Sequence, residues 1–184
     1  VGTLVDGEDG IVDILGLRHG DFAHITGVFA VHVDQAAGVD DEVGSVEDAA
    51  AVELEEHRLR LDAVDLRIAQ VTVTGAVLKE HHATEEELVL TFREPVAPGA
   101  KVSVMISYTA SPDRGLYFRT PEMGYPAGDT QLWTQGEPEL HRFWFPGYDF
   151  PNERFTSEVI CHAPEEMEVV SNGALISRTR NSSG

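Results

Sequence analysis

The chain of 184 residues has few basic residues and a single cysteine. It carries 13 Lys and Arg against 32 Asp and Glu, for a formal net charge of -19. Such a surface repels phosphate backbones and anionic lipid, which argues against binding to nucleic acids or to membrane surfaces. The single cysteine, Cys161, excludes an internal disulfide and leaves the compartment open.

Long apolar runs are missing as well. A transmembrane helix needs about 18 or more apolar residues in succession, and the sequence contains no such stretch. The first ten residues, VGTLVDGEDG, are acidic, contain no hydrophobic signal core and do not begin with Met. We therefore expect that the natural amino terminus is missing, and we favour a cytoplasmic location.

The part of the chain after Arg67 alternates between apolar and polar residues, which is typical of β-strands with one buried face. Segments 88–92 and 102–109 both show this period of two, and Pro95 to Gly99 (PVAPG) joins them with residues that break pairing and form turns. Asn172-Gly173, between 169–170 and 174–176, is typical of a hairpin. These patterns predict an all-β, antiparallel domain, and the length fits one domain.

The part of the chain before Arg67 is different, because it holds half of the acidic residues and shows less regular patterning. Segment 22–34 alternates as a strand does. Ser45-Val46-Glu47-Asp48 resembles a capping box ahead of AAAVELEEHRL, which predicts a short helix near residues 45–58. We therefore divide the chain into an unplaced acidic segment, residues 1–55, and a β domain, residues 56–184.

The most informative stretch is QLWTQGEPELHRFWFPGYDFPNERFTSEVICHAPEEMEVVSNGAL, from Gln131 to Leu175. It contains T-Q-x-E, then R-x-x-F-P-x-x-D-x-P, then S-N-G, in that order. This series resembles the amino-terminal domain of zinc aminopeptidases of the aminopeptidase N type, which include the leukotriene-epoxide hydrolase. The matching positions are Thr134, Gln135, Glu137, Arg142, Phe145, Pro146, Asp149, Pro151, Ser171, Asn172 and Gly173.

The resemblance extends from Leu59 to Leu175. LRLDAVDLRIAQVTVTG (59–75) is similar to a pair of strands in the family, and SYTASPDRGLYF (107–118) to the approach to its G-L-Y strand. Three positions depart from the family pattern: Gly147 replaces a common Cys, His141 precedes the motif arginine where a small residue is usual, and Pro138 follows Glu137. The resemblance implies a saddle-like antiparallel sheet or sandwich assembly, cut short at its carboxy end, so we expect a fragment.

The same resemblance implies a role for Glu137. An aminopeptidase must hold the free α-ammonium of its substrate, and a charge-assisted hydrogen bond to a carboxylate contributes roughly 1.5–3 kcal/mol. In the family the residue at this position does so, and the glutamine at Gln135 lines the pocket for the first side chain. A solvated loop acid is the alternative for Glu137. Arg142, Pro146, Asp149 and Pro151 are interpreted as structural, because buried charges are rarely left unpaired and proline stiffens the segment.

The sequence gives less support for a metal site than for the role of Glu137. His81 and His82 lie near Glu85, Glu86 and Glu87, but in a polar connection where a solvated turn is the default. The sequence has neither the H-E-x-x-H motif, which supplies two zinc ligands and a catalytic glutamate, nor the family's G-x-M-E-N segment. The resemblance therefore implies zinc in the full-length enzyme, with ligands outside this chain, and we expect this polypeptide to be inactive by itself.

Three functions remain open. The first is the substrate-anchoring domain of a zinc aminopeptidase, with a peptide amino terminus and a downstream catalytic domain of the same polypeptide as partners. The second is a non-catalytic scaffold, because one subunit of the general transcription factor that recognises core promoters shares this fold and a W-F-P-x-x-D segment, here Trp144 to Asp149. The third is a β-sandwich that binds a carbohydrate or a protein through exposed aromatics. Gln135 and Glu137 favour the peptidase.

Overall fold

The computed structural model describes residues 2–6, 11–15, 25–34, 54–55, 57–97, 100–151 and 157–180. Strands and three short 3-10 helices (η) are the regular elements of these residues. The strands are β1 (Gly2–Asp6), β2 (Ile11–Leu15), β3 (Ile25–Asp34), β4 (Leu54–Glu55), β5 (Arg58–Asp62), β6 (Arg67–Thr74), β7 (Leu78–Ala83), β8 (Glu87–Phe92), β9 (Lys101–Ala110), β10 (Leu116–Arg119), β11 (Gln131–Thr134), β12 (Ser157–Cys161) and β13 (Leu175–Arg178). The 3-10 helices are η1 (Pro121–Met123), η2 (Ala127–Asp129) and η3 (His141–Phe143).

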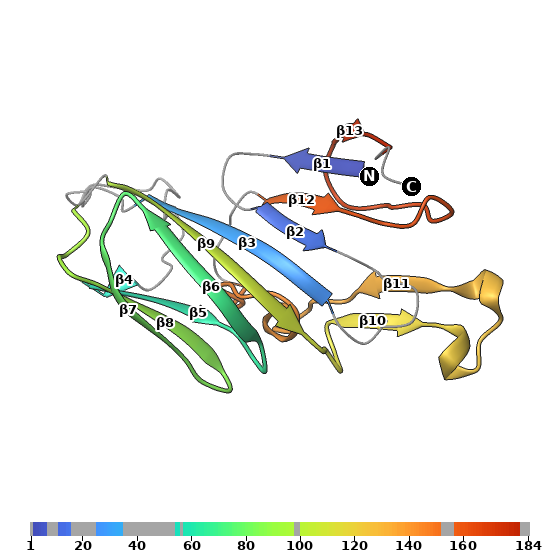
Figure 1. The fold of residues 1–184 in the computed structure, drawn as a ribbon, viewed down its shortest axis with the longest axis horizontal. Helices are drawn as coiled ribbons and strands as arrows, with labels where there is room; N and C mark the ends of the chain where they lie inside the picture. The colour runs from blue at the N-terminus through green and yellow to red at the C-terminus, as the bar shows by residue number, and fades with distance from the viewer. Residues whose placement is uncertain are drawn as a thin grey trace, which may run out of the picture.

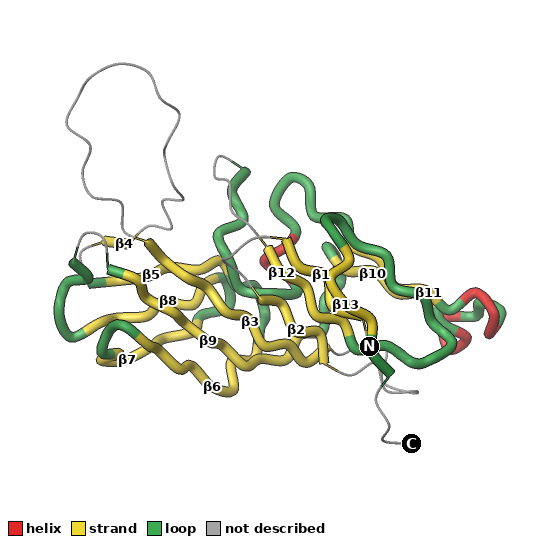
Figure 2. Tube along the Cα trace, turned by 90° about the horizontal axis from the view of Figure 1, so that it is seen from above, coloured by secondary structure: helices red, strands yellow, loops and turns green. Residues whose placement is uncertain are grey.

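The strands form three sheets (Figure 1). A seven-stranded sheet has the order β13-β1-β12-β2-β3-β9-β6, a four-stranded sheet the order β4-β5-β8-β7, and β10 and β11 form a two-stranded ribbon. All the pairs are antiparallel except β12 with β2, which is parallel. In Figures 1 and 2 the four-stranded sheet lies at one end of the elongated molecule and the ribbon at the other.

The core lies between the four-stranded sheet and the β9 side of the seven-stranded sheet. Alternate residues of β8 and β9 point into it, while their neighbours are more exposed, as the period of two predicts. Met105, between two core residues of β9, is 50% exposed. One cluster contains the buried side chains of both sheets: Leu59, Leu61, Leu88, Leu90, Phe92, Val102, Val104, Ile106 and Tyr108. The all-β prediction is confirmed, and the assembly is a sandwich of mostly antiparallel sheets.

Three sequence predictions differ from the structure. Of the helix near residues 45–58, residues 54, 55 and 58 lie in strands because β4 pairs with β5, and residues 45–53 and 56 lie outside the described residues. Segment 59–75 forms two strands, as expected, but their pairing with each other is wrong, since β5 pairs with β4 and β8 while β6 pairs with β9. The hairpin at Asn172-Gly173 is also wrong: Gly173 has φ 85° and turns the chain, but β13 bonds to β1 and residues 169–170 form no strand.

Three strands from the first 55 residues belong to the seven-stranded sheet. β3 pairs with β9 along ten residues, from Ile25 opposite Ala110 to Asp34 opposite Lys101. β2 pairs with β3, and β1 lies between β12 and β13. The domain boundary at residue 55 stays a prediction. Among the described residues, no helix is long and apolar enough to cross a membrane.

Candidate functional site

The T-Q-x-E motif lies where the β10–β11 ribbon ends. Thr134 is the last residue of β11 and pairs with Leu116, and the amide of Gln135 donates to the Gly115 carbonyl at 2.9 Å. The chain then leaves the ribbon and turns, and the Leu140 amide donates to the Gly136 carbonyl at 2.8 Å. The backbone is therefore hydrogen-bonded on both sides of Glu137, which gives the loop a fixed position on the domain.

The side chains of Gln135 and Glu137 are exposed. Within the described part of the chain, neither side chain has a hydrogen-bond or ion-pair partner. A carboxylate in this position keeps its acceptor sites for a ligand from solution. Both side chains are accessible on the same loop, separated by one residue in the sequence, and their roles stay predictions.

Close packing explains how the segment after the loop approaches the ribbon. Gly115 has φ +79°, and a Cβ there would overlap the Leu140 carbonyl oxygen and lie 3.2 Å from Trp144 Cδ1. The glycine therefore lets two backbone segments touch. Trp144 itself is buried, with its ring centroid 4.5 Å from that of Phe145 in an edge-on arrangement.

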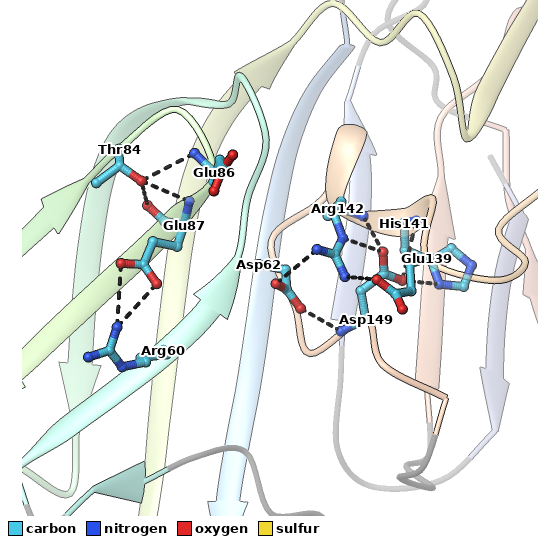
Figure 3. Close-up of polar contacts among 9 residues, drawn as sticks. All are labelled: Arg60, Asp62, Thr84, Glu86, Glu87, Glu139, His141, Arg142 and Asp149. Atoms are coloured by element: carbon cyan, nitrogen blue, oxygen red, sulfur yellow. Dashed lines mark hydrogen bonds and ion pairs between the residues drawn. The ribbon is translucent and has the colours of Figure 1, made fainter.

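Arg142 and Asp149 form an ion pair behind the loop (Figure 3), with 3.1 Å between Arg142 Nε and Asp149 Oδ2. Asp149 also accepts from the backbone amides of His141 at 3.3 Å and Arg142 at 3.1 Å, and its Oδ1 lies 3.1 Å from His141 Nδ1. The other guanidinium nitrogens reach Glu139 at 2.8 Å and Asp62 at 3.4 Å. One arginine thus joins three carboxylates.

The Asp149 side chain is only 1% exposed. Burial disfavours its charged form, but hydrogen bonds from His141 and from the backbone and side chain of Arg142 outweigh burial and lower the pKa of Asp149. The carboxylate is therefore held ionised, and its charge is balanced by the guanidinium beside it. We interpret this group as a structural anchor for segment 139–149.

Asp62 links this anchor to the four-stranded sheet. Its carboxylate accepts from the Asp149 amide at 3.0 Å, and its own amide donates to the Gly147 carbonyl at 2.7 Å. The Val64 amide donates to the Arg142 carbonyl at 2.8 Å. Asp62 was not singled out from the sequence, because its partner lies 87 residues away and no local pattern announces it.

The two motif prolines take different places. Pro146 is buried beside the bridge between Asp62 and Gly147, whereas Pro151 is exposed in a turn. Aromatic side chains also cover the ribbon: the Tyr117 and Trp133 rings stack with centroids 5.7 Å apart, and Trp133 is 46% exposed. Trp133 lies on β11, which leads into Gln135, and Tyr117 lies opposite it on β10.

The histidine pair does not form a metal site. His81 and His82 lie in β7, not in the connection after it, and both are exposed. The connection is closed by Thr84, whose Oγ1 accepts from the Glu86 and Glu87 amides, and Glu87 pairs with Arg60 at 3.2 Å (Figure 3). No group of three His, Cys, Asp or Glu side chains among the described residues is arranged to bind a metal.

Comparisons with known proteins agree with one another. The family model of the peptidase M1 N-terminal domain matches residues 32–184. The M1 zinc metallopeptidase from Deinococcus radiodurans superposes with a TM-score of 0.67 at 19% identity, over 98% of this chain and 37% of that one. A variant of a two-domain M1 zinc metallopeptidase bound to L-arginine gives 0.65 at 18% identity, over 98% and 37%.

More distant structures share the fold too. Native leukotriene A4 hydrolase from Saccharomyces cerevisiae gives a TM-score of 0.54 at 13% identity, over 89% of this chain and 24% of that one. The chain therefore spans between 24% and 37% of the length of these solved structures. A search of curated proteins finds no match.

Proposed function

Because the chain belongs to the family of peptidase M1 N-terminal domains, we propose that it anchors the substrate of a zinc aminopeptidase. In this proposal the Glu137 carboxylate accepts hydrogen bonds from the α-ammonium of a peptide, and Gln135 lines the pocket for the first side chain. The membership confirms the resemblance drawn from the T-Q-x-E, R-x-x-F-P-x-x-D-x-P and S-N-G series.

The exposed carboxylate of Glu137 on a fixed loop carries this proposal. Most surface carboxylates stand on long, mobile side chains and gain little from pairing with a cation. Here the backbone on both sides of Glu137 is hydrogen-bonded, through Gln135 to Gly115 and through Gly136 to Leu140. A ligand ammonium would meet an acceptor whose backbone position is already set, so less ordering entropy opposes binding.

Zinc belongs to another part of the proposed enzyme. The described residues provide no set of metal ligands, and the complete sequence has no H-E-x-x-H motif. Two of the solved neighbours named above are M1 zinc metallopeptidases, and one of these has two domains. We therefore propose that a catalytic domain of the same polypeptide binds the zinc, and that the peptide amino terminus is bound between that domain and Glu137.

The test compares Glu137→Ala with the wild type in the full-length enzyme. Loss of a contact of roughly 1.5–3 kcal/mol should lower kcat/KM about 10- to 150-fold for aminoacyl-arylamides with a free amino group. Substrates with a blocked amino group should change little, because they never make the contact. Glu137→Gln should be milder, since an amide oxygen still accepts from an ammonium.

A matched control comes from Glu166, which is exposed and far along the chain from the T-Q-x-E motif. Glu166→Ala should leave kcat/KM unchanged for both kinds of substrate. Wild-type kinetics in a folded Glu137→Ala enzyme would contradict the anchoring role of Glu137. The chain by itself should show neither turnover nor stoichiometric zinc.

A further inference from the structure

The His141 imidazole fills the space beside Gly136, between Gln135 and Glu137. A Cβ built on Gly136 would overlap the ring: it would lie 2.6 Å from Cε1 and closer still to Cδ2 and Nε2. Gly136 is not one of the residues with positive φ. A side chain at this position would therefore have to displace the group that takes up the space, the imidazole of His141.

The ring is held in place from its other side. Nδ1 lies 3.1 Å from Asp149 Oδ1, and the Asp149 carboxylate is buried and paired with Arg142. The Phe145 ring centroid is 5.3 Å from that of His141, and the Trp144 ring is edge-on at 6.4 Å. The imidazole thus has one nitrogen on the structural anchor and the other toward the loop.

From this arrangement we propose that His141 is a positioning residue for Glu137. Its Nδ1 edge is bound to Asp149, so its Nε2 edge forms a rigid support for the backbone of Gly136. That backbone sets where the next residue, Glu137, projects. The contact between His141 and Gly136 is inferred from the geometry alone. Its effect on substrate binding rests on the proposed function of Glu137.

Substitution of His141 by asparagine separates the role of Nδ1 from that of Nε2. Its side-chain amide occupies the place of Nδ1 and can still donate to Asp149, but it has no atom in the place of Nε2. His141→Asn should therefore keep the domain folded and remove only the support under Gly136. His141→Ala removes both edges and serves as the harsher comparison.

The first experiment uses this chain and the denaturant midpoint of unfolding. Gly136→Ala should lower the midpoint, because the new methyl group overlaps the ring. In the His141→Asn background the same change should cost clearly less, since the space is free. Gly128→Ala, where a Cβ would meet nothing within 4 Å, is the control and should change little. Equal losses from Gly136→Ala in both backgrounds would overturn the contact.

A second readout reports on the surroundings of the Gly136 and Glu137 backbone. In NMR spectra of the chain, His141→Asn should shift the backbone amide resonances of Gly136 and Glu137, while those of β7, the edge strand of the four-stranded sheet, stay in place. Unchanged resonances at Gly136 and Glu137 would overturn the positioning role. Neither this measurement nor the unfolding experiment depends on any peptidase activity.

The final experiment is kinetic and uses the full-length enzyme. His141→Asn should lower kcat/KM for free-amine substrates toward the about 10- to 150-fold loss expected for Glu137→Ala, and spare blocked substrates. The double variant with Glu137→Ala should lose no more than Glu137→Ala alone. Additive losses, or equal losses on blocked substrates, would overturn the positioning of Glu137. If Glu137→Ala itself has no effect, the proposed function fails, while the chain experiments still decide the contact.

Discussion

Removal of the Asp149 carboxylate should destabilise the domain more than any exposed acid does. Breaking a buried ion pair by deleting one partner costs about 3–5 kcal/mol. Arg142 would keep Glu139 and Asp62, and its side chain is 23% exposed, so Asp149→Ala should fall at the lower end, about 3 kcal/mol. Asp149→Asn keeps one acceptor oxygen and should cost about 1–2 kcal/mol, because neutral hydrogen bonds contribute less than charged ones.

Urea unfolding of the chain measures this loss. With a slope of about 1–3 kcal/mol per molar urea, a loss of about 3 kcal/mol lowers the midpoint by about 1–3 M. The control is Asp113→Ala, because Asp113 also pairs with an arginine, Arg114, but has a side chain that is 73% exposed. Its midpoint should not move. If the midpoints of Asp149→Ala and Asp113→Ala agree, the anchor does not stabilise the fold and the reasoning is refuted.

The same carboxylate predicts a dependence on pH. The pKa of Asp149 is lowered in the folded state, so its stabilising contribution is complete above the unfolded value of about 3.9 and is lost as the pH falls through the folded pKa. Wild-type stability should therefore decline below about pH 4. The decline should be shallower in Asp149→Asn, which has no charge to lose, and an equal decline in both proteins would contradict the assignment.

The remaining predictions concern the core, a turn and the anchoring acid. Tyr108→Phe should raise stability by about 1 kcal/mol, because the buried Tyr108 hydroxyl has no hydrogen-bond partner among the described residues; a loss in urea unfolding would contradict this. Gly75→Ala should destabilise more than Gly124→Ala: both residues have φ +89°, but only at Gly75 would a Cβ overlap the Lys101 carbonyl oxygen. Equal midpoints would show that the strain of a positive φ, and not the overlap with Lys101, determines the loss of stability. Glu137→Ala should give the selective kinetic loss described above.

Strands were predictable from the sequence where one face of the strand is buried. The alternation in β8 and β9 is visible residue by residue, and the structure buries the expected face. The partners of the strands were not predictable, because pairing depends on residues far away in the sequence. Leu54 and Glu55 suit a helix by composition, but pairing with β5 places them in a strand.

The site divides in the same way. The rule that buried charges are paired led from the sequence to Arg142 and Asp149, and the two side chains are in contact. Asp62 gave no local signal, since its contacts to Asp149 and Gly147 join two distant segments. The contact of His141 with Gly136 could be found only from the structure. The sequence marked His141 as unusual for the family, but only the overlap between its ring and a Cβ built on Gly136 shows what it touches.

The seven-stranded sheet combines the first strands of the chain with its last. β1, at Gly2–Asp6, has β12 and β13 as its two neighbours, and β2 lies between β12 and β3. A ribosome delivers residues 157–180 long after residues 2–15 have emerged, so β1 and the β12 edge of β2 must wait for their partners. Pairing across such a separation closes large loops and slows folding. During synthesis the early strands therefore expose backbone edges that can pair with other chains.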